Sequence, residues 1–211
     1  NISYTDVPVE FKDGTVVTLR KPTLKITDLA FGEMHPKTEF SARVAPPMIG
    51  LGLLESISKE TILGFADQQL ADKQGISGKA NYVLDVQTNE MALGRFGWKA
   101  GQPNLMQQNA AAFNGDLGLT SRLFPNENCT SAQSTCDDFP NGGKPEVSDN
   151  ILDFVEFYSQ HLAVPIRRNV DNPVVVQGKK LFKDAGCQSC HQAEFRTAER
   201  EGLPALSNQL I

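Results

Sequence analysis

The chain has 211 residues, of which 40% are hydrophobic and 21% charged, a composition typical of a folded globular protein. Its net charge of −5 and pI near 5.2 exclude an overall basic field that would attract nucleic acid or anionic lipid. No apolar run approaches the roughly 20 residues that span a bilayer, and the N-terminal sequence NISYTDVPVEF lacks the pattern of a signal peptide.

Strand signals dominate the first thirty residues. The pair Asp13-Gly14 separates two runs rich in β-branched residues, which predicts a β-hairpin. Residues 36–52 contain three prolines and two glycines and are expected to be irregular. A helix is predicted next over residues 56–70, with Ser58 as its N-cap.

The middle of the chain alternates between loops and a second helix. Residues 71–101 are glycine-rich, which predicts a loop with short extended pieces. Asn104 is the expected N-cap of a helix that ends near Gly115. A long polar loop should follow over residues 114–147.

Two helices are predicted in the last third. The first is capped by Ser148 and ends before Pro165. Its apolar side chains fall at helical spacing on one expected buried face: Ile151, Leu152, Phe154, Val155, Tyr158, His161 and Leu162. The second helix begins at Asp171 or Asn172, takes Pro173 in its first turn, and leads to Cys187.

Four cysteines form two sequence pairs, and the first pair lies in the loop sequence NENCTSAQSTCDDF. Cys129 and Cys136 are close enough along the chain to close a small disulfide, and no histidine lies near them to suggest zinc. A disulfide there would indicate an oxidising compartment.

The second pair lies in the sequence KDAGCQSCHQAEF, where Cys187, Cys190 and His191 form a C-x-x-C-H motif. Cysteines at i and i+3 lie on one side of a helical turn, and a histidine at i+4 lies over the same face. This spacing is typical of covalent haem attachment, in which two thiols hold the porphyrin and the imidazole binds the iron.

Other origins of the motif fit less well. Zinc would need further paired ligands, and the remaining histidines, His35 and His161, each stand alone. A redox-active dithiol would require a βαβ pattern around the motif, which residues 170–200 lack. A chance occurrence stays open.

Several blocks of the chain together resemble the bacterial di-haem oxidoreductases, which are labelled thiol oxidoreductases and are related to the di-haem cytochrome c peroxidases. They are SARVAPPMIGLGLLESI, GRFGWKAGQPNLMQQNAAAFNGDLGLTS, HLAVPIRRNVDNPVVVQGKKLF and AGCQSCHQAEFRT. The resemblance covers about residues 14–211. It implies a mainly α-helical, cytochrome c-like fold with a small N-terminal β element and long loops.

The resemblance also implies a domain organisation. Residues 1–165 would be the N-terminal and inter-haem region, and residues 166–211 the start of a c-type haem domain. Family members have two C-x-x-C-H motifs and continue beyond PALSNQLI, whereas this chain has one motif and stops there. We therefore expect an internal or truncated piece of such an oxidoreductase.

Peroxidase-like chemistry is a further implication of the resemblance. Trp98, Leu105 and Gln108 match the spacing of a tryptophan, a leucine and a glutamine in the di-haem peroxidases. By resemblance, Trp98 would conduct electrons between two haems and Gln108 would approach the peroxide. The acid–base glutamate of those enzymes corresponds to Gly118 here, with Asp116 close by, which weighs against a peroxidase.

The sixth iron ligand has several candidates because no methionine follows His191. They are Met48, Met106 and His161, and Met48 lies in an irregular Pro-Pro segment from which a side chain can reach a metal. Arg167 and Arg168 could pair with haem propionates.

The sequence thus leads to one main hypothesis and one rival. The main hypothesis is a periplasmic haem c protein in electron transfer, with peroxidase-like activity in the intact oxidoreductase. Its expected partner is a small redox protein that donates or accepts electrons, with neither nucleic acid nor a transmembrane segment involved. The rival is a non-enzymatic, disulfide-stabilised binding or assembly domain whose CQSCH motif is unfilled.

Overall fold

A computed structural model describes residues 1–211 apart from residues 31, 73, 74, 132 and 134. The chain divides into two compact units. Unit 1 contains Asn1–Ala45 and Thr130–Thr135, and unit 2 contains Pro46–Cys129 and Cys136–Ile211. Each unit is described by itself below.

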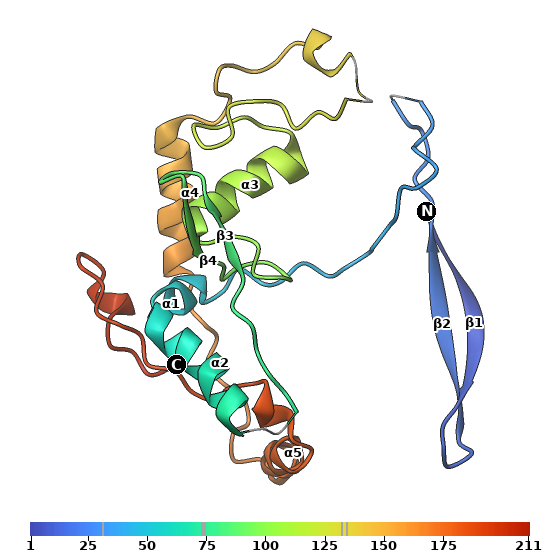
Figure 1. The fold of residues 1–211 in the computed structure, drawn as a ribbon, viewed down its shortest axis with the longest axis vertical. Helices are drawn as coiled ribbons and strands as arrows, with labels where there is room; N and C mark the ends of the chain where they lie inside the picture. The colour runs from blue at the N-terminus through green and yellow to red at the C-terminus, as the bar shows by residue number, and fades with distance from the viewer. Residues whose placement is uncertain (31, 73–74, 132, 134) are drawn as a thin grey trace. The chain divides into compact units, whose positions relative to one another are not determined.

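Unit 1 contains a two-stranded antiparallel sheet, drawn in blue in Figure 1. Strand β1 (Ile2–Glu10) pairs along its whole length with β2 (Val16–Leu24). Between them Gly14 adopts a φ of 83°, and the Asp13 carboxylate accepts a hydrogen bond from the backbone N–H two residues later, at 3.0 Å. The hairpin predicted at Asp13-Gly14 is confirmed.

Unit 2 combines helices with a second hairpin. Its strands are β3 (Tyr82–Asp85) and β4 (Glu90–Leu93), which pair antiparallel. Its helices are α1 (Leu51–Glu55), α2 (Lys59–Asp72), α3 (Leu105–Leu117), α4 (Asp149–His161) and α5 (Pro173–Asp184). Three short 3-10 helices complete it: η1 (Cys136–Asp138), η2 (Cys187–Ser189) and η3 (Pro204–Leu206).

The helices begin where short polar side chains can satisfy the first free backbone N–H groups. The predicted caps Ser58, Asn104 and Ser148 each accept a hydrogen bond from the N–H three residues later, at 2.8–3.4 Å. Asn172 caps α5 in the same way, accepting from the Val174 N–H at 2.9 Å. These four helix starts are confirmed.

The hydrophobic core of unit 2 lies where α3 meets α4, which cross at an angle in Figure 1. A buried hydrogen bond joins the Asn109 amide of α3 to the Ser159 hydroxyl of α4 at 3.3 Å. The core is formed by Met106, Ala110, Val147 and Leu152, against which Phe113, Leu119, Leu123 and Phe124 pack.

The predicted buried face of α4 is largely wrong. Leu152 is fully buried, but Ile151, Phe154, Tyr158 and His161 are exposed. Apolar residues occupy more than one side of this helix, and only the side that contains Leu152 packs into the core. Helical spacing identified the helix without identifying its buried side.

Helix α1 approaches α4 so closely that only glycine fits at the contact. A Cβ atom added at Gly52 would lie 2.1 Å from the carbonyl oxygen of Gln160. Two residues earlier, the Gly50 N–H donates to the Leu162 carbonyl at 2.8 Å. The two backbones are therefore in direct contact at the end of α4.

The expectation of a mainly α-helical, cytochrome c-like fold is wrong. The chain is about 30% helical and 15% strand, and its five α-helices are short, none exceeding 14 residues in the part of the chain described. In long irregular segments the backbone N–H and C=O groups form their hydrogen bonds outside helices. The Glu146 carboxylate, for example, accepts from the N–H groups of Thr120 at 3.0 Å and Gly142 at 2.8 Å, which braces the loop after α3. Across the described residues, no helix is long and apolar enough to cross a membrane.

Candidate functional site

The CQSCH motif occupies a single tight turn after α5. Gly186 ends the helix with a φ of 76°, a left-handed conformation that glycine adopts without strain, and η2 begins at the next residue. The Cys187 carbonyl then accepts hydrogen bonds from the N–H groups of Cys190 at 3.2 Å and His191 at 3.0 Å. The turn therefore holds both thiols and the imidazole within one short, hydrogen-bonded unit.

The three side chains of the motif are available for chemistry. Both cysteines are free thiols; Cys187 is half-buried and Cys190 is exposed. The His191 ring meets the edge of Phe182, with ring centroids 5.8 Å apart and planes inclined by 62°. Within the described part of the chain, neither ring nitrogen of His191 takes part in a hydrogen bond or ion pair. Phe182 thus orients an imidazole whose nitrogens can bind a metal.

Helix α5 leaves apolar side chains exposed beside the motif. None of its residues is buried, and its apolar residues Val174, Leu181 and Phe182 are exposed. Exposed apolar surface of this kind marks a place where another apolar group binds. A flat, hydrophobic group attached at Cys187 and Cys190 would find such a surface here.

The segment after the motif anchors it to the rest of unit 2. Backbone hydrogen bonds pair Phe195 with Ile211, and the Ala198 N–H donates to the Ser56 carbonyl at the end of α1, at 2.7 Å. The Phe195 ring contacts the Phe65 ring of α2 edge to face, with centroids 5.5 Å apart. The motif therefore lies between α5 and a segment that is docked on α1 and α2.

A carboxylate cluster near this anchor was not predicted from the sequence. Glu55 accepts from the Leu105 N–H at 2.8 Å and pairs with Arg200 at 3.4 Å. Burial raises the pKa of Glu156 above its ordinary value, and the nearby negative charges of Glu55 and Asp153 raise it further. Glu55 precedes Asp153 by 98 positions and Glu156 by 101, so only the tertiary structure reveals the cluster.

The raised pKa of Glu156 predicts a pH-dependent gain in stability when its charge is removed. Ionisation of Glu156 lowers the free energy of unfolding as pH rises above 4.5, its ordinary pKa. We expect Glu156→Gln to raise Tm by about 1–3 °C at pH 7 and to have no such effect below about pH 4. Thermal denaturation at both pH values measures this, with the exposed Glu90→Gln as control. An equal rise at both pH values would contradict it.

The residues predicted for peroxidase-like chemistry lie in and before α3. Trp98 is 61% exposed in the turn between Phe96 and Gln102. The side-chain oxygen of Gln108 is buried and has no hydrogen-bond partner among the described residues. Gly118 ends α3 in a left-handed conformation with a φ of 69°.

The neighbouring Gln107 has a structural role instead. Its side chain accepts from the Val86 N–H at 2.9 Å and donates to the Leu84 carbonyl at 3.1 Å, which ties α3 to β3. The two adjacent glutamines therefore differ. The side-chain oxygen of Gln107 already accepts a hydrogen bond, whereas that of Gln108 has no partner among the described residues and can accept one from a ligand.

The candidates for a sixth iron ligand have different surroundings. Met106 is buried and its sulfur accepts a hydrogen bond from Arg122 at 3.5 Å. His161 stacks on Phe157, and its Nδ1 lies 2.7 Å from the Phe157 carbonyl oxygen. Met48 is partly exposed in the irregular segment before α1. Among described residues, no hydrogen bond or ring contact joins any of these three, Trp98 or Gln108 to the motif.

The first cysteine pair forms a disulfide. Cys129 and Cys136 are bonded, with their Cα atoms 6.2 Å apart, and they line a polar hollow of about 520 Å³ together with Asn126, Asn141 and Lys144. The bond closes a short loop within the long polar segment that the sequence predicted.

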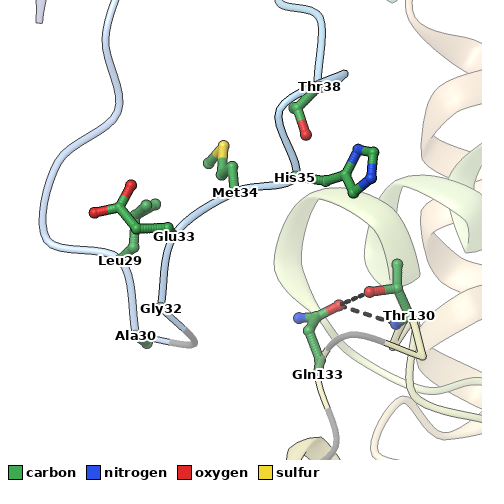
Figure 2. A pocket seen from close by; sticks show the side chains of 9 residues that line it. All are labelled: Leu29, Ala30, Gly32, Glu33, Met34, His35, Thr38, Thr130 and Gln133. Atoms are coloured by element: carbon green, nitrogen blue, oxygen red, sulfur yellow. Dashed lines mark hydrogen bonds between the residues drawn. The ribbon is translucent and has the colours of Figure 1, made fainter.

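Unit 1 contains a separate pocket of about 310 Å³, shown in Figure 2. Met34 and His35 line it, and the His35 Nδ1 accepts from the Lys37 N–H at 3.2 Å. On its other side, the Gln133 side chain accepts hydrogen bonds from the N–H and hydroxyl of Thr130. None of the predicted site residues lines this pocket. Within the described ranges, no group of three or more His, Cys, Asp or Glu side chains is placed to hold a metal ion.

A family model described as "Di-haem oxidoreductase, putative peroxidase" matches residues 1–211, the whole length of the chain. Comparisons with curated proteins and with solved structures give no match.

Proposed function

The chain belongs to the di-haem oxidoreductase family, and we propose that it attaches one c-type haem through Cys187 and Cys190 and binds its iron through His191. The observation that carries this proposal is the single turn that holds two free thiols and an unengaged imidazole together. A haem so attached supplies an iron that exchanges single electrons. The function we propose is therefore electron transfer.

The residues around the motif fit such a group. Phe182 contacts the His191 ring edge to face, which would favour one orientation of the imidazole that binds iron. The apolar side chains of α5 would cover one side of the porphyrin and lower the polarity around it. Cys190 is exposed, so the porphyrin edge it holds would lie near solvent, where a redox partner can approach.

Met48 is the sixth iron ligand that we propose. Met106 is buried and its sulfur is hydrogen-bonded, while His161 is held against Phe157. Met48 lies in an irregular, partly exposed segment, so its side chain can move without breaking a helix. Arg167 and Arg168 are exposed before α5 and are our candidates for pairing with the propionates.

Peroxidase-like activity of the intact oxidoreductase is a second proposal. The buried, unpartnered oxygen of Gln108 supports it, because such an oxygen is available to a polar ligand. Trp98 is the proposed electron conduit. Gly118 provides no side chain for acid–base catalysis, so a proton donor would have to be another residue, such as Asp116.

The proposal also states in which compartment the protein lies and which part of the chain binds the haem. A disulfide between Cys129 and Cys136 supports an exported, periplasmic protein, because disulfides persist in oxidising compartments. Residues 166–211 would bind the haem, and residues 1–165 would form the inter-haem region of the oxidoreductase. Its expected partner is a small redox protein.

An absorption spectrum tests the proposal against its rival, a disulfide-stabilised binding domain. The chain is expressed with the machinery that attaches c-type haem, purified, and denatured in alkaline pyridine. We expect a Soret band and the haemochrome bands of a haem c that stays with the protein. A correctly folded chain without these bands would contradict the proposal and favour the rival.

A further inference from the structure

Three lysines lie in the last turns of α5, directly before the CQSCH motif. They are Lys179, Lys180 and Lys183, and all are exposed. Lys179 and Lys183 are four residues apart, and Lys180 and Lys183 are three apart, so helical geometry places the three side chains on one side of α5.

The three lysines lie on the side of α5 opposite Val174 and Leu181, and Val176 lies among them. Val174 and Leu181 are seven residues apart and share one side, whereas Phe182, which contacts His191, lies between that side and Lys179. The lysines project away from this side. They therefore leave Val174 and Leu181 free to contact a porphyrin.

The positive charge on this side is only partly neutralised. Lys180 forms an ion pair with Asp184 one turn later, whereas Lys179 and Lys183 have no ion pair in the described part of the chain. Residues 166–191 contain five basic and two acidic side chains. The rest of the chain contains fifteen basic and twenty-three acidic ones, since the whole has 20 and 25. An acidic protein thus has a basic segment at its proposed redox centre.

We propose that Lys179, Lys180 and Lys183 form a docking surface for an acidic redox protein, which they would orient toward the exposed Cys190. Unneutralised lysines attract an oppositely charged patch and orient it during encounter. The rest of the chain has a net negative charge, so its overall field does not attract the same partner. That the partner is a redox protein rests on the proposed function; the lysine surface rests on charge and geometry.

Binding of an acidic probe tests the docking surface. The probe is a plant-type [2Fe–2S] ferredoxin, a small acidic electron carrier, and its Kd is measured by calorimetry at about 20 mM and about 200 mM ionic strength. We expect Lys179→Glu with Lys183→Glu to weaken binding about tenfold or more at low ionic strength. The neutral pair Lys179→Gln with Lys183→Gln should weaken binding less than the acidic pair.

A matched control separates the local surface from the overall charge. Lys99→Glu with Lys144→Glu makes the same change in net charge at two exposed lysines of unit 2 outside α5. We expect this pair to leave Kd within about twofold of the unmodified chain. Equal weakening by both pairs, an unchanged Kd in the α5 pair, or no binding by the unmodified chain at low salt would overturn the proposal.

The same preparations distinguish this inference from the proposed function. Covalent haem is quantified in every variant before the titration. Absence of haem in all of them contradicts the proposed function, whereas normal haem with an unchanged Kd contradicts only the docking surface. Helix content from circular dichroism verifies that the α5 substitutions leave the fold intact.

Discussion

Replacing Cys187 and Cys190 with alanine is expected to abolish covalent haem attachment completely. The thioether bonds form at the two sulfurs, so no other side chain of the turn can substitute for them. The hydrogen bonds that shape the turn join backbone atoms of residues 187, 190 and 191, and alanine retains them. The fold should therefore survive the substitution. Haem staining after denaturing electrophoresis measures the effect directly.

Two further variants make this test specific. Cys129→Ala with Cys136→Ala removes the other two cysteines and should retain covalent haem, at a cost of about 2–3 kcal/mol in stability from the lost disulfide. His191→Ala should lower the haem yield or change the spectrum of any haem that remains, because the proposed iron ligand is lost. Covalent haem in the Cys187/Cys190 variant would contradict the assignment.

The second large effect concerns the fold. Gly52→Ala should destabilise unit 2 by about 2–4 kcal/mol, because the new methyl group would lie 2.1 Å from the Gln160 carbonyl oxygen. That neighbour is backbone within α4, so it cannot move aside as a flexible side chain could. The helices α1 and α4 would have to separate, which would also disturb the Ala198–Ser56 hydrogen bond that anchors the segment after the motif.

Gly64→Ala is the matched control for this prediction. Gly64 lies in α2, and a Cβ atom added there meets nothing within 4 Å. Alanine has the higher helix propensity, so we expect a gain of about 0.5–1 kcal/mol. Chemical denaturation monitored by circular dichroism measures both variants. A Gly52→Ala chain as stable as the unmodified one would contradict the close contact between α1 and α4.

Local signals in the sequence predicted the starts of the main elements. Ser58, Asn104, Ser148 and Asn172 cap the helices as expected, and Asp13-Gly14 forms the turn of the hairpin. These features depend on residues within a few positions of one another. A short stretch of sequence is therefore enough to predict them.

Features that depend on distant residues could not be predicted. The contact of Gly52 with Gln160, and that of Glu55 with Arg200, join positions more than one hundred residues apart. The α4 pattern likewise predicted the helix and the burial of Leu152, but most of its other predicted core residues are exposed because apolar side chains surround much of the helix. The family resemblance predicted a mainly α-helical fold. The chain is only about 30% helical because long irregular loops take the place of helices.

The reactive side chains of the candidate site could be predicted from the sequence. The residues that surround them were harder to predict. The spacing of Cys187, Cys190 and His191 was visible in the sequence, and the structure adds that Phe182 contacts the histidine. The sequence singled out Gln108. It did not show that the side chain of the neighbouring Gln107 is hydrogen-bonded to the Val86 N–H and the Leu84 carbonyl. Which of two adjacent glutamines is free depends on a strand about twenty residues away.

The intact mass of the denatured chain tests the central claim most directly. The chain is expressed with the c-type haem attachment machinery, unfolded in acid, and weighed beside the Cys187→Ala, Cys190→Ala variant. We predict that the unmodified chain is heavier than its polypeptide by the mass of one haem and that the variant has the polypeptide mass alone. A folded, unmodified chain at its bare polypeptide mass would contradict the proposed function.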